Sequence, residues 1–173
     1  MPRIIVCPLS HVPTSVSTHR ASHLVTLIKD GTRVERPHSI AADRHLFLTF
    51  DDIVEPIDGM FPPAEEHAEA LLSFVDQWDQ KRPIVVHCFA GISRSTAAAF
   101  IMLCALRPGR SESQIALRLR SASPSATPNI RLVGFADRLL ERRGRMIAAI
   151  EAIGRGEAAF EGVPFVLPVI DEA

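Results

Sequence analysis

The amino-acid sequence predicts a single α/β domain whose central, mostly parallel sheet of four to five strands is flanked by helices. Three observations predict this class. The chain has 173 residues, which favours one domain and suffices for one buried core. In its first half, short β-branched runs alternate with stretches of helical period. In its second half, helical stretches follow one another, which is typical of an α/β domain with a helical C-terminal side.

Short apolar runs predict four strands. They cover Arg3–Cys7, His23–Ile28, His45–Phe50 and Pro83–His87. The last run is almost continuously apolar, as in a parallel strand that is buried on both faces. One or two helical turns are expected between the first two strands. Residues 30–45 and 51–63 are rich in turn-forming residues and predict loops.

Helices are predicted in the remainder of the chain. From Ala64, apolar residues recur at helical spacing, with Pro63 and two glutamates at the start and Lys81-Arg82-Pro83 after the end. The stretch Ser95–Leu106 is almost wholly apolar, which predicts a helix buried in the core. Three further helical stretches cover Ser111–Ala122, Pro128–Arg143 and Arg145–Ile153.

Composition bounds the domain organisation and the partners. We place the domain at residues 1–155 and expect the apolar, proline-broken tail 156–173 to pack on it or to fray. The net charge of −1 favours neither a nucleic-acid nor a membrane partner. Three cysteines give no disulfide framework and fit a reducing compartment. With no recognisable leader or membrane-spanning run, we expect a cytoplasmic protein.

The stretch IVVHCFAGISRS, residues 84–95, concentrates the reactive groups. Cys88 and Arg94 lie five residues apart, between a predicted buried strand and a predicted buried helix. Such a strand–loop–helix unit presents several backbone N–H groups to one point, and Gly91 permits a positive φ. An arginine fork matches two phosphate oxygens, and helix N-termini and cations favour thiolates. The stretch therefore predicts an anion site with a nucleophile at its floor.

The string HCFAGISRS resembles the H-C-x5-R-[ST] signature loop of the cysteine-based protein tyrosine phosphatase superfamily, and especially its dual-specificity group. Downstream, SPSATPN (Ser123–Asn129), followed by Leu132 and Leu139-Leu140, resembles the helix start that follows the signature helix in that group. The Asp51-Asp52-Ile53 segment lies where the family keeps its general acid. The resemblance covers residues 47–140 and implies a dual-specificity phosphatase-like fold and a compact, bacterial-type member.

The resemblance implies a role for each residue of the loop. Cys88 would attack phosphorus and form a phosphocysteine, Arg94 would hold the phosphoryl oxygens, and Ser95 would hydrogen-bond the thiolate. His87 would orient the loop from behind. Backbone N–H groups would complete the phosphate site, and they belong to Phe89, Ala90, Gly91, Ile92, Ser93 and Arg94.

An aspartate is expected to protonate the leaving oxygen and later to deprotonate water. We favour Asp52, because it comes just after a predicted strand with Ile53 as an apolar anchor. Asp58 and Asp51 are the alternatives, in that order.

Departures from the family pattern bound the substrate. The chain has no tyrosine, and the aromatic recognition loop of the tyrosine-specific branch has no counterpart. The variable loop positions carry no basic residue, which disfavours polyphosphorylated inositides. We therefore expect phosphotyrosine with phosphoserine or phosphothreonine in proteins, or a small phosphate ester. The alternatives are a catalytically weak phosphate-binding module, or a cysteine enzyme of the sulfurtransferase or arsenate reductase type.

No pattern among the other titratable residues predicts a metal site, and we expect no cofactor. The remaining histidines lack metal-ligand spacing, and we interpret them as surface or capping groups. Cys104 is expected in the core, as is Cys7, for which a disulfide with Cys88 on oxidation stays an alternative. The sequence does not fix the oligomeric state.

Overall fold

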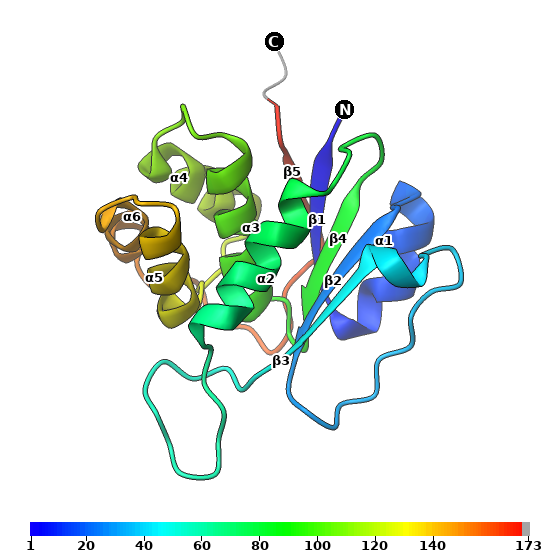
Figure 1. Cartoon of the computed structure of the whole chain (residues 1–173), viewed down its shortest axis with the longest axis horizontal. Helices are drawn as coiled ribbons and strands as arrows, with labels where there is room; N and C mark the ends of the chain where they lie inside the picture. The colour runs from blue at the N-terminus through cyan, green and yellow to red at the C-terminus, as the bar shows by residue number, and fades with distance from the viewer. Residues whose placement is uncertain (171–173) are drawn as a thin grey trace.

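The structure is a computed structural model that describes residues 1–170, and it contains one five-stranded sheet (Figure 1). The strand order across the sheet is β3-β2-β4-β1-β5. The strands are β1 (Arg3–Pro8), β2 (His23–Ile28), β3 (His45–Thr49), β4 (Ile84–Cys88) and β5 (Phe165–Pro168). The first four are parallel to one another, whereas β5 runs antiparallel to β1. The predicted α/β class with a mostly parallel sheet is confirmed.

Helices cover both faces of the sheet, and they do so unequally (Figure 1). They are α1 (Val12–His19), α2 (Glu65–Asp76), α3 (Arg94–Leu106), α4 (Glu112–Ala122), α5 (Ile130–Leu139) and α6 (Arg145–Ile153). Helix α1 packs on one face, where Val12 and Val16 join a small apolar cluster. Helices α2–α6 form the thick layer on the other face and enclose the main core. Short 3-10 turns at Leu9–His11 and Ala42–Arg44 complete the described helices.

Helix α3 is the central element of the thick layer. Its side chains from Arg94 to Cys104 are all buried, as its almost wholly apolar sequence predicts. Strand β4, which precedes it, is buried along its whole length between β1 and β2. The chain therefore passes from the centre of the sheet to the centre of the core at residues 88–94. This turn lies at the edge where the four parallel strands end, which is where open α/β sheets bind ligands.

Strand β5 brings the C-terminal tail back to the sheet. Leu167 pairs with Ile4, and Phe165 pairs with Val6. Pro164 precedes the strand and Pro168 ends it, which an edge strand tolerates because one side of it makes no ladder bonds. Residues 165–168 thus dock on the domain, whereas the proposed limits 1–155 and 156–173 stay a prediction.

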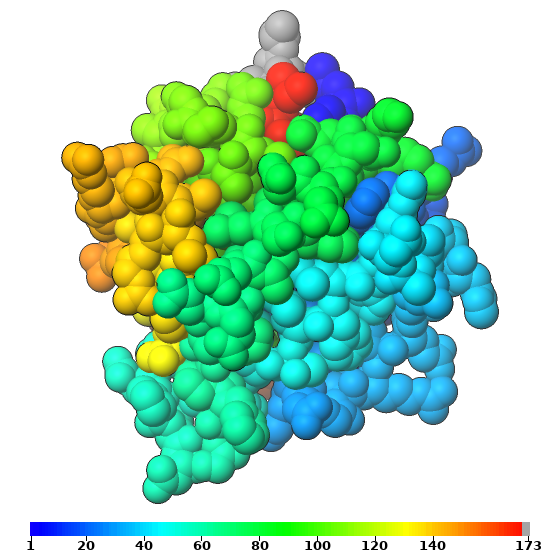
Figure 2. Space-filling model, viewed as in Figure 1, coloured from blue at the N-terminus to red at the C-terminus, as the bar shows by residue number. Residues whose placement is uncertain are grey.

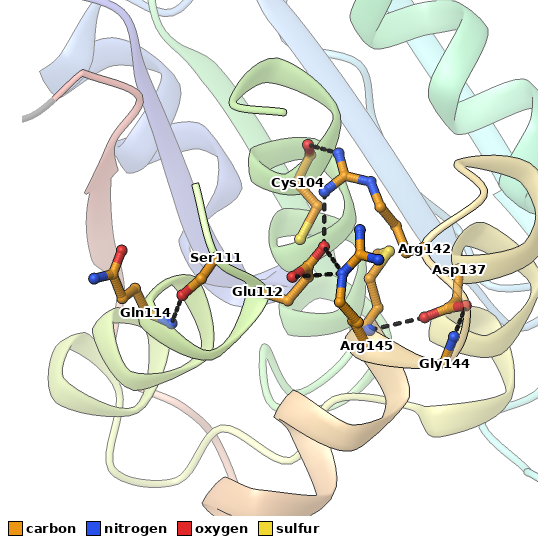
Figure 3. Close-up of polar contacts among 9 residues, drawn as sticks. Cys104, Ser111, Glu112, Gln114, Asp137, Arg142, Gly144 and Arg145 are labelled. Carbon is orange, nitrogen blue, oxygen red and sulfur yellow. Dashed lines mark hydrogen bonds and ion pairs between the residues drawn. The ribbon is translucent and has the colours of Figure 1, made fainter. Parts of the chain in front are cut away.

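A buried ion pair joins the helices of the thick layer (Figure 3). Arg142 Nη1 donates to Glu112 Oε1 at 2.8 Å, and its Nη2 donates to the carbonyl oxygen of Cys104 at 2.8 Å. Burial raises the pKa of Glu112, but its own backbone N–H and the guanidinium groups of Arg142 and Arg145 outweigh burial and lower it overall. The predicted helix Pro128–Arg143 is too long, because α5 ends at Leu139. The chain turns after this residue so that Arg142 can point back into the core and make these contacts.

Candidate active site

The loop between β4 and α3 wraps around the thiol of Cys88. The backbone N–H of Gly91 donates to Cys88 Sγ at 3.2 Å, and Ser95 Oγ lies 3.1 Å from the same sulfur. Gly91 has a φ of 71°, and a Cβ at this position would lie 2.7 Å from the backbone nitrogen of Pro8. Only glycine fits both the positive φ and this close approach of β1. The sulfur therefore lies at the floor of a tightly turned loop, at the N-terminus of α3.

The carbonyl groups of this loop are hydrogen-bonded to segments that are distant in sequence. Each accepts a backbone N–H from outside the loop: Phe89 from Leu9 at 3.1 Å, Ala90 from Gly162 at 2.7 Å, Ile92 from Thr127 at 2.9 Å and Ser93 from Asn129 at 3.3 Å. A peptide unit that points its carbonyl outward points its N–H the other way. These contacts therefore fix the loop in a conformation suited to binding an anion with its N–H groups.

Arg94 begins α3 and has an unused hydrogen-bond donor. Its side chain is 8% exposed, and Nη1 donates to the carbonyl oxygen of Phe50 at 2.9 Å. Its Nε is buried and has no hydrogen-bond partner among residues 1–170. A buried charged donor without a partner is costly, and an anion bound at the loop supplies the acceptor.

His87 lies behind the loop and is the last of three hydrogen-bonded side chains. Its Nδ1 donates to the carbonyl oxygen of Cys88 at 3.1 Å, so Nε2 is the acceptor of the neutral ring. Thr26 Oγ1 donates to that nitrogen at 2.7 Å and accepts from His45 Nε2 at 2.8 Å. Burial lowers the pKa of His87 to about 4; the hydrogen bond to Cys88 opposes this shift, whereas the charges of His45 and Arg94 add to it. His87 is therefore a neutral ring that orients the carbonyl of Cys88.

The sequence did not predict that His45 and Thr26 would take part in this row of hydrogen-bonded side chains. His45 was interpreted as a surface or capping group, which is wrong, because it is half-buried and bonded to Thr26. Thr26 is fully buried in β2, opposite His87 in the parallel register with β4. The sequence feature that could have revealed Thr26 is its hydroxyl group in the otherwise apolar run LVTLI, residues 24–28.

The three candidate aspartates differ in their surroundings. Asp52 is exposed beside the loop, where its Oδ1 accepts from Ser93 Oγ at 2.7 Å and from Asn129 Nδ2 at 2.9 Å. Asp51 is buried, and its Oδ2 accepts the backbone N–H of Phe61 at 2.8 Å, which closes the base of the 51–63 loop. Asp58 is exposed at a turn of that loop, which projects from the body of the molecule (Figure 1). Of the three, Asp52 is the one hydrogen-bonded to the signature loop.

Asn129 was noted only as part of a motif, and the structure gives its side chain three hydrogen bonds. Its side-chain oxygen accepts the N–H of Leu132 and so caps α5. Its Nδ2 donates to Asp52 and to the carbonyl oxygen of Ile53 at 3.2 Å. Asn129 therefore ties the start of α5 to the segment that carries the aspartate.

The other two cysteines are buried away from solvent. Burial raises the pKa of Cys7 to about 11 and that of Cys104 to about 12, so both thiols stay protonated at neutral pH. All three cysteines are free, and a Cys7–Cys88 disulfide stays a prediction. Residues 1–170 hold no group of three or more His, Cys, Asp or Glu arranged to bind a metal ion. None of the helices in this part of the chain is long and apolar enough to cross a membrane.

Part of the chain matches a known family, and its fold is similar to solved structures. Residues 56–129 match the model of the protein-tyrosine phosphatase family. The fold resembles human DUSP28 (TM-score 0.62, 15% identity, covering 81% of this chain and 92% of that chain) and DUSP15 (0.60, 16%, 91% and 96%). It also resembles the Yvh1 phosphatase domain from Chaetomium thermophilum (0.63, 18%, 83% and 93%). No curated protein matches the sequence.

Proposed function

We propose that the chain is a member of the cysteine-based protein tyrosine phosphatase superfamily and that it hydrolyses phosphomonoesters through a phosphocysteine on Cys88. We propose phosphotyrosine, with phosphoserine or phosphothreonine, in proteins as its substrates. One observation carries the proposal most directly. A thiol that accepts a loop N–H lies in the same turn as a buried arginine whose Nε has no acceptor among residues 1–170.

In the first step the thiolate of Cys88 attacks phosphorus, and the bond between phosphorus and the leaving oxygen breaks. Arg94 and the loop N–H groups neutralise the charge on the three equatorial oxygens. Asp52 donates its proton to the leaving oxygen, which departs as an alcohol or phenol. The enzyme is left with a phosphocysteine and an ionised Asp52.

In the second step a water molecule attacks the phosphocysteine. Asp52 accepts a proton from the water, the sulfur–phosphorus bond breaks, and inorganic phosphate leaves. The electron pair of that bond returns to Cys88 Sγ, where the Ser95 hydroxyl, 3.1 Å away, stabilises the thiolate by donating a hydrogen bond. The second step restores the proton of Asp52.

The role of Cys88 is tested by turnover of p-nitrophenyl phosphate. Cys88→Ser should abolish turnover while keeping a phosphopeptide bound, and vanadate should inhibit the unmodified protein. Iodoacetate should inactivate the protein by modifying Cys88 alone, because the raised pKa of Cys7 and Cys104 keeps those buried thiols protonated. Phosphate binding without turnover would instead identify a phosphate-binding module, and thiosulfate turnover would identify a sulfurtransferase.

The role of Asp52 is tested by varying the leaving group. Asp52→Asn should lower kcat about 10²- to 10⁴-fold for an alkyl phosphate, whose leaving oxygen needs a proton. It should lower kcat far less for p-nitrophenyl phosphate, whose leaving group departs unprotonated. Asp58→Asn, in the same loop, is the matched control and should change neither. If the two variants exchange these results, Asp58 is the acid.

A further inference from the structure

A groove of about 890 Å³ opens beside the phosphate-binding loop. Asp52, Ile92 and Ser93 line the end that adjoins the loop, and the groove continues past the start of α5 to residues 150–159. Figure 2 shows, at the lower left, the 51–63 loop in teal beside the start of the α5 region in yellow. Cys88 and Arg94 do not line the groove, so the groove is a separate subsite next to the phosphate-binding loop.

The groove combines an apolar lining with negative charge. Its apolar lining includes five isoleucines, and they are Ile53, Ile57, Ile92, Ile130 and Ile150. Besides Asp52, it is lined by three glutamates, Glu55, Glu151 and Glu157, against a single cation, Arg155.

The three glutamates are exposed, and no ion pair or side-chain hydrogen bond within residues 1–170 engages their carboxylates. This groove therefore presents net negative charge next to the loop that we propose binds phosphate.

We propose that this groove binds basic residues that flank the phosphorylated residue of a protein substrate. The methylene stem of a lysine or arginine can lie along the isoleucines while its charged head reaches a glutamate. A substrate that carries a phosphate and a neighbouring cation would thus match both halves of the site. Acidic flanking residues would meet like charge in the groove. The inference rests on the proposed phosphatase function and names its substrate class.

The test compares three phosphotyrosine peptides of equal length, flanked by arginine, alanine or glutamate. Exposed ion pairs are individually weak, so three carboxylates should favour the arginine peptide over the glutamate peptide by about tenfold in kcat/KM. The preference should shrink as salt is raised, because the charges are exposed to solvent.

Substitutions in the groove test whether its carboxylates cause the preference. The double variant E151Q/E157Q should lose most of the preference, and E151K should favour the glutamate peptide more than E151Q does. All variants should keep the p-nitrophenyl phosphate turnover of the unmodified protein, because no hydrogen bond or ion pair within residues 1–170 joins either side chain to the loop. Glu69→Gln, at an exposed position of α2 outside the groove, is the control for removing a negative charge.

The outcomes separate the two proposals. If the unmodified protein does not turn over p-nitrophenyl phosphate, the phosphatase function itself is contradicted. Normal turnover with equal kcat/KM for the three peptides would overturn the groove assignment alone. A preference that survives in E151Q/E157Q, or that Glu69→Gln reduces equally, would also overturn it.

Discussion

Replacing His87 by asparagine should remove a pH-dependent share of the stability of the fold. In the folded protein, burial lowers the pKa of His87 from 6.5 to about 4. Between these values the unfolded chain binds a proton that the folded chain does not. The free energy of unfolding of the unmodified protein therefore falls as the pH drops from above 6.5 toward 4. The full effect of this shift is about 3 kcal/mol, of which about 2 kcal/mol is lost by about pH 5.

The assay is urea unfolding of both proteins at about pH 8 and about pH 5. The stability advantage of the unmodified protein over His87→Asn should be about 2 kcal/mol smaller at the lower pH. Three other histidines whose pKa is lowered are present in both proteins and cancel in this difference; they are His19, His23 and His67. His45 is coupled to His87 through Thr26, so its titration is part of the measured difference. His38→Asn, at an exposed position, controls for the replacement itself. An advantage that is equal at the two pH values would refute the neutral, buried ring.

Two further substitutions test the support of the loop and the helical layer. Gly162→Ala would place a Cβ 2.8 Å from the carbonyl oxygen of Gly91, so the phosphate-binding loop must shift. The kcat for p-nitrophenyl phosphate should therefore fall about tenfold or more. The control Gly109→Ala, whose Cβ would lie in open space, should leave kcat unchanged, and an unchanged kcat in Gly162→Ala would contradict the prediction. Glu112→Gln leaves the charge of Arg142 buried without its partner and should lower the free energy of unfolding by about 3 kcal/mol in urea at neutral pH. The kcat of folded Glu112→Gln should equal that of the unmodified protein, and an unchanged stability would show that the ion pair contributes little.

Local sequence patterns predicted most of the fold because its parallel strands and its central helix are strongly apolar. Strand β5 was not predicted, because a four-residue strand that follows one proline and ends in another carries little periodic signal of its own. Its formation depends on the free edge of β1, which is a tertiary feature. The end of α5 was misplaced for a similar reason, since the contacts of Arg142 with Glu112 and Cys104 override a helical pattern that continues further.

The candidate site was predictable to the extent that it lies within one loop. Cys88, Arg94 and Ser95 are brought together by a single turn whose residues are contiguous. Thr26 and the carbonyl of Phe50 reach the site through the order and register of strands, which spacing along the chain does not reveal. The alternatives for the acid stayed open because a loop of turn-forming residues has many conformations.

Asp52 connects the proposed chemistry with the proposed substrate class. Its Oδ1 accepts hydrogen bonds from Ser93 in the phosphate loop and from Asn129 at the start of α5, and it also lines the groove. A flanking residue bound at this end of the groove would therefore lie next to the residue that we propose as the proton donor. Binding energy from a part of the substrate that does not react can then be used to orient the acid, and such energy raises kcat as well as affinity. Substrates too short to reach the groove should accordingly show a lower kcat, and not only a higher KM, whenever departure of the leaving group needs a proton.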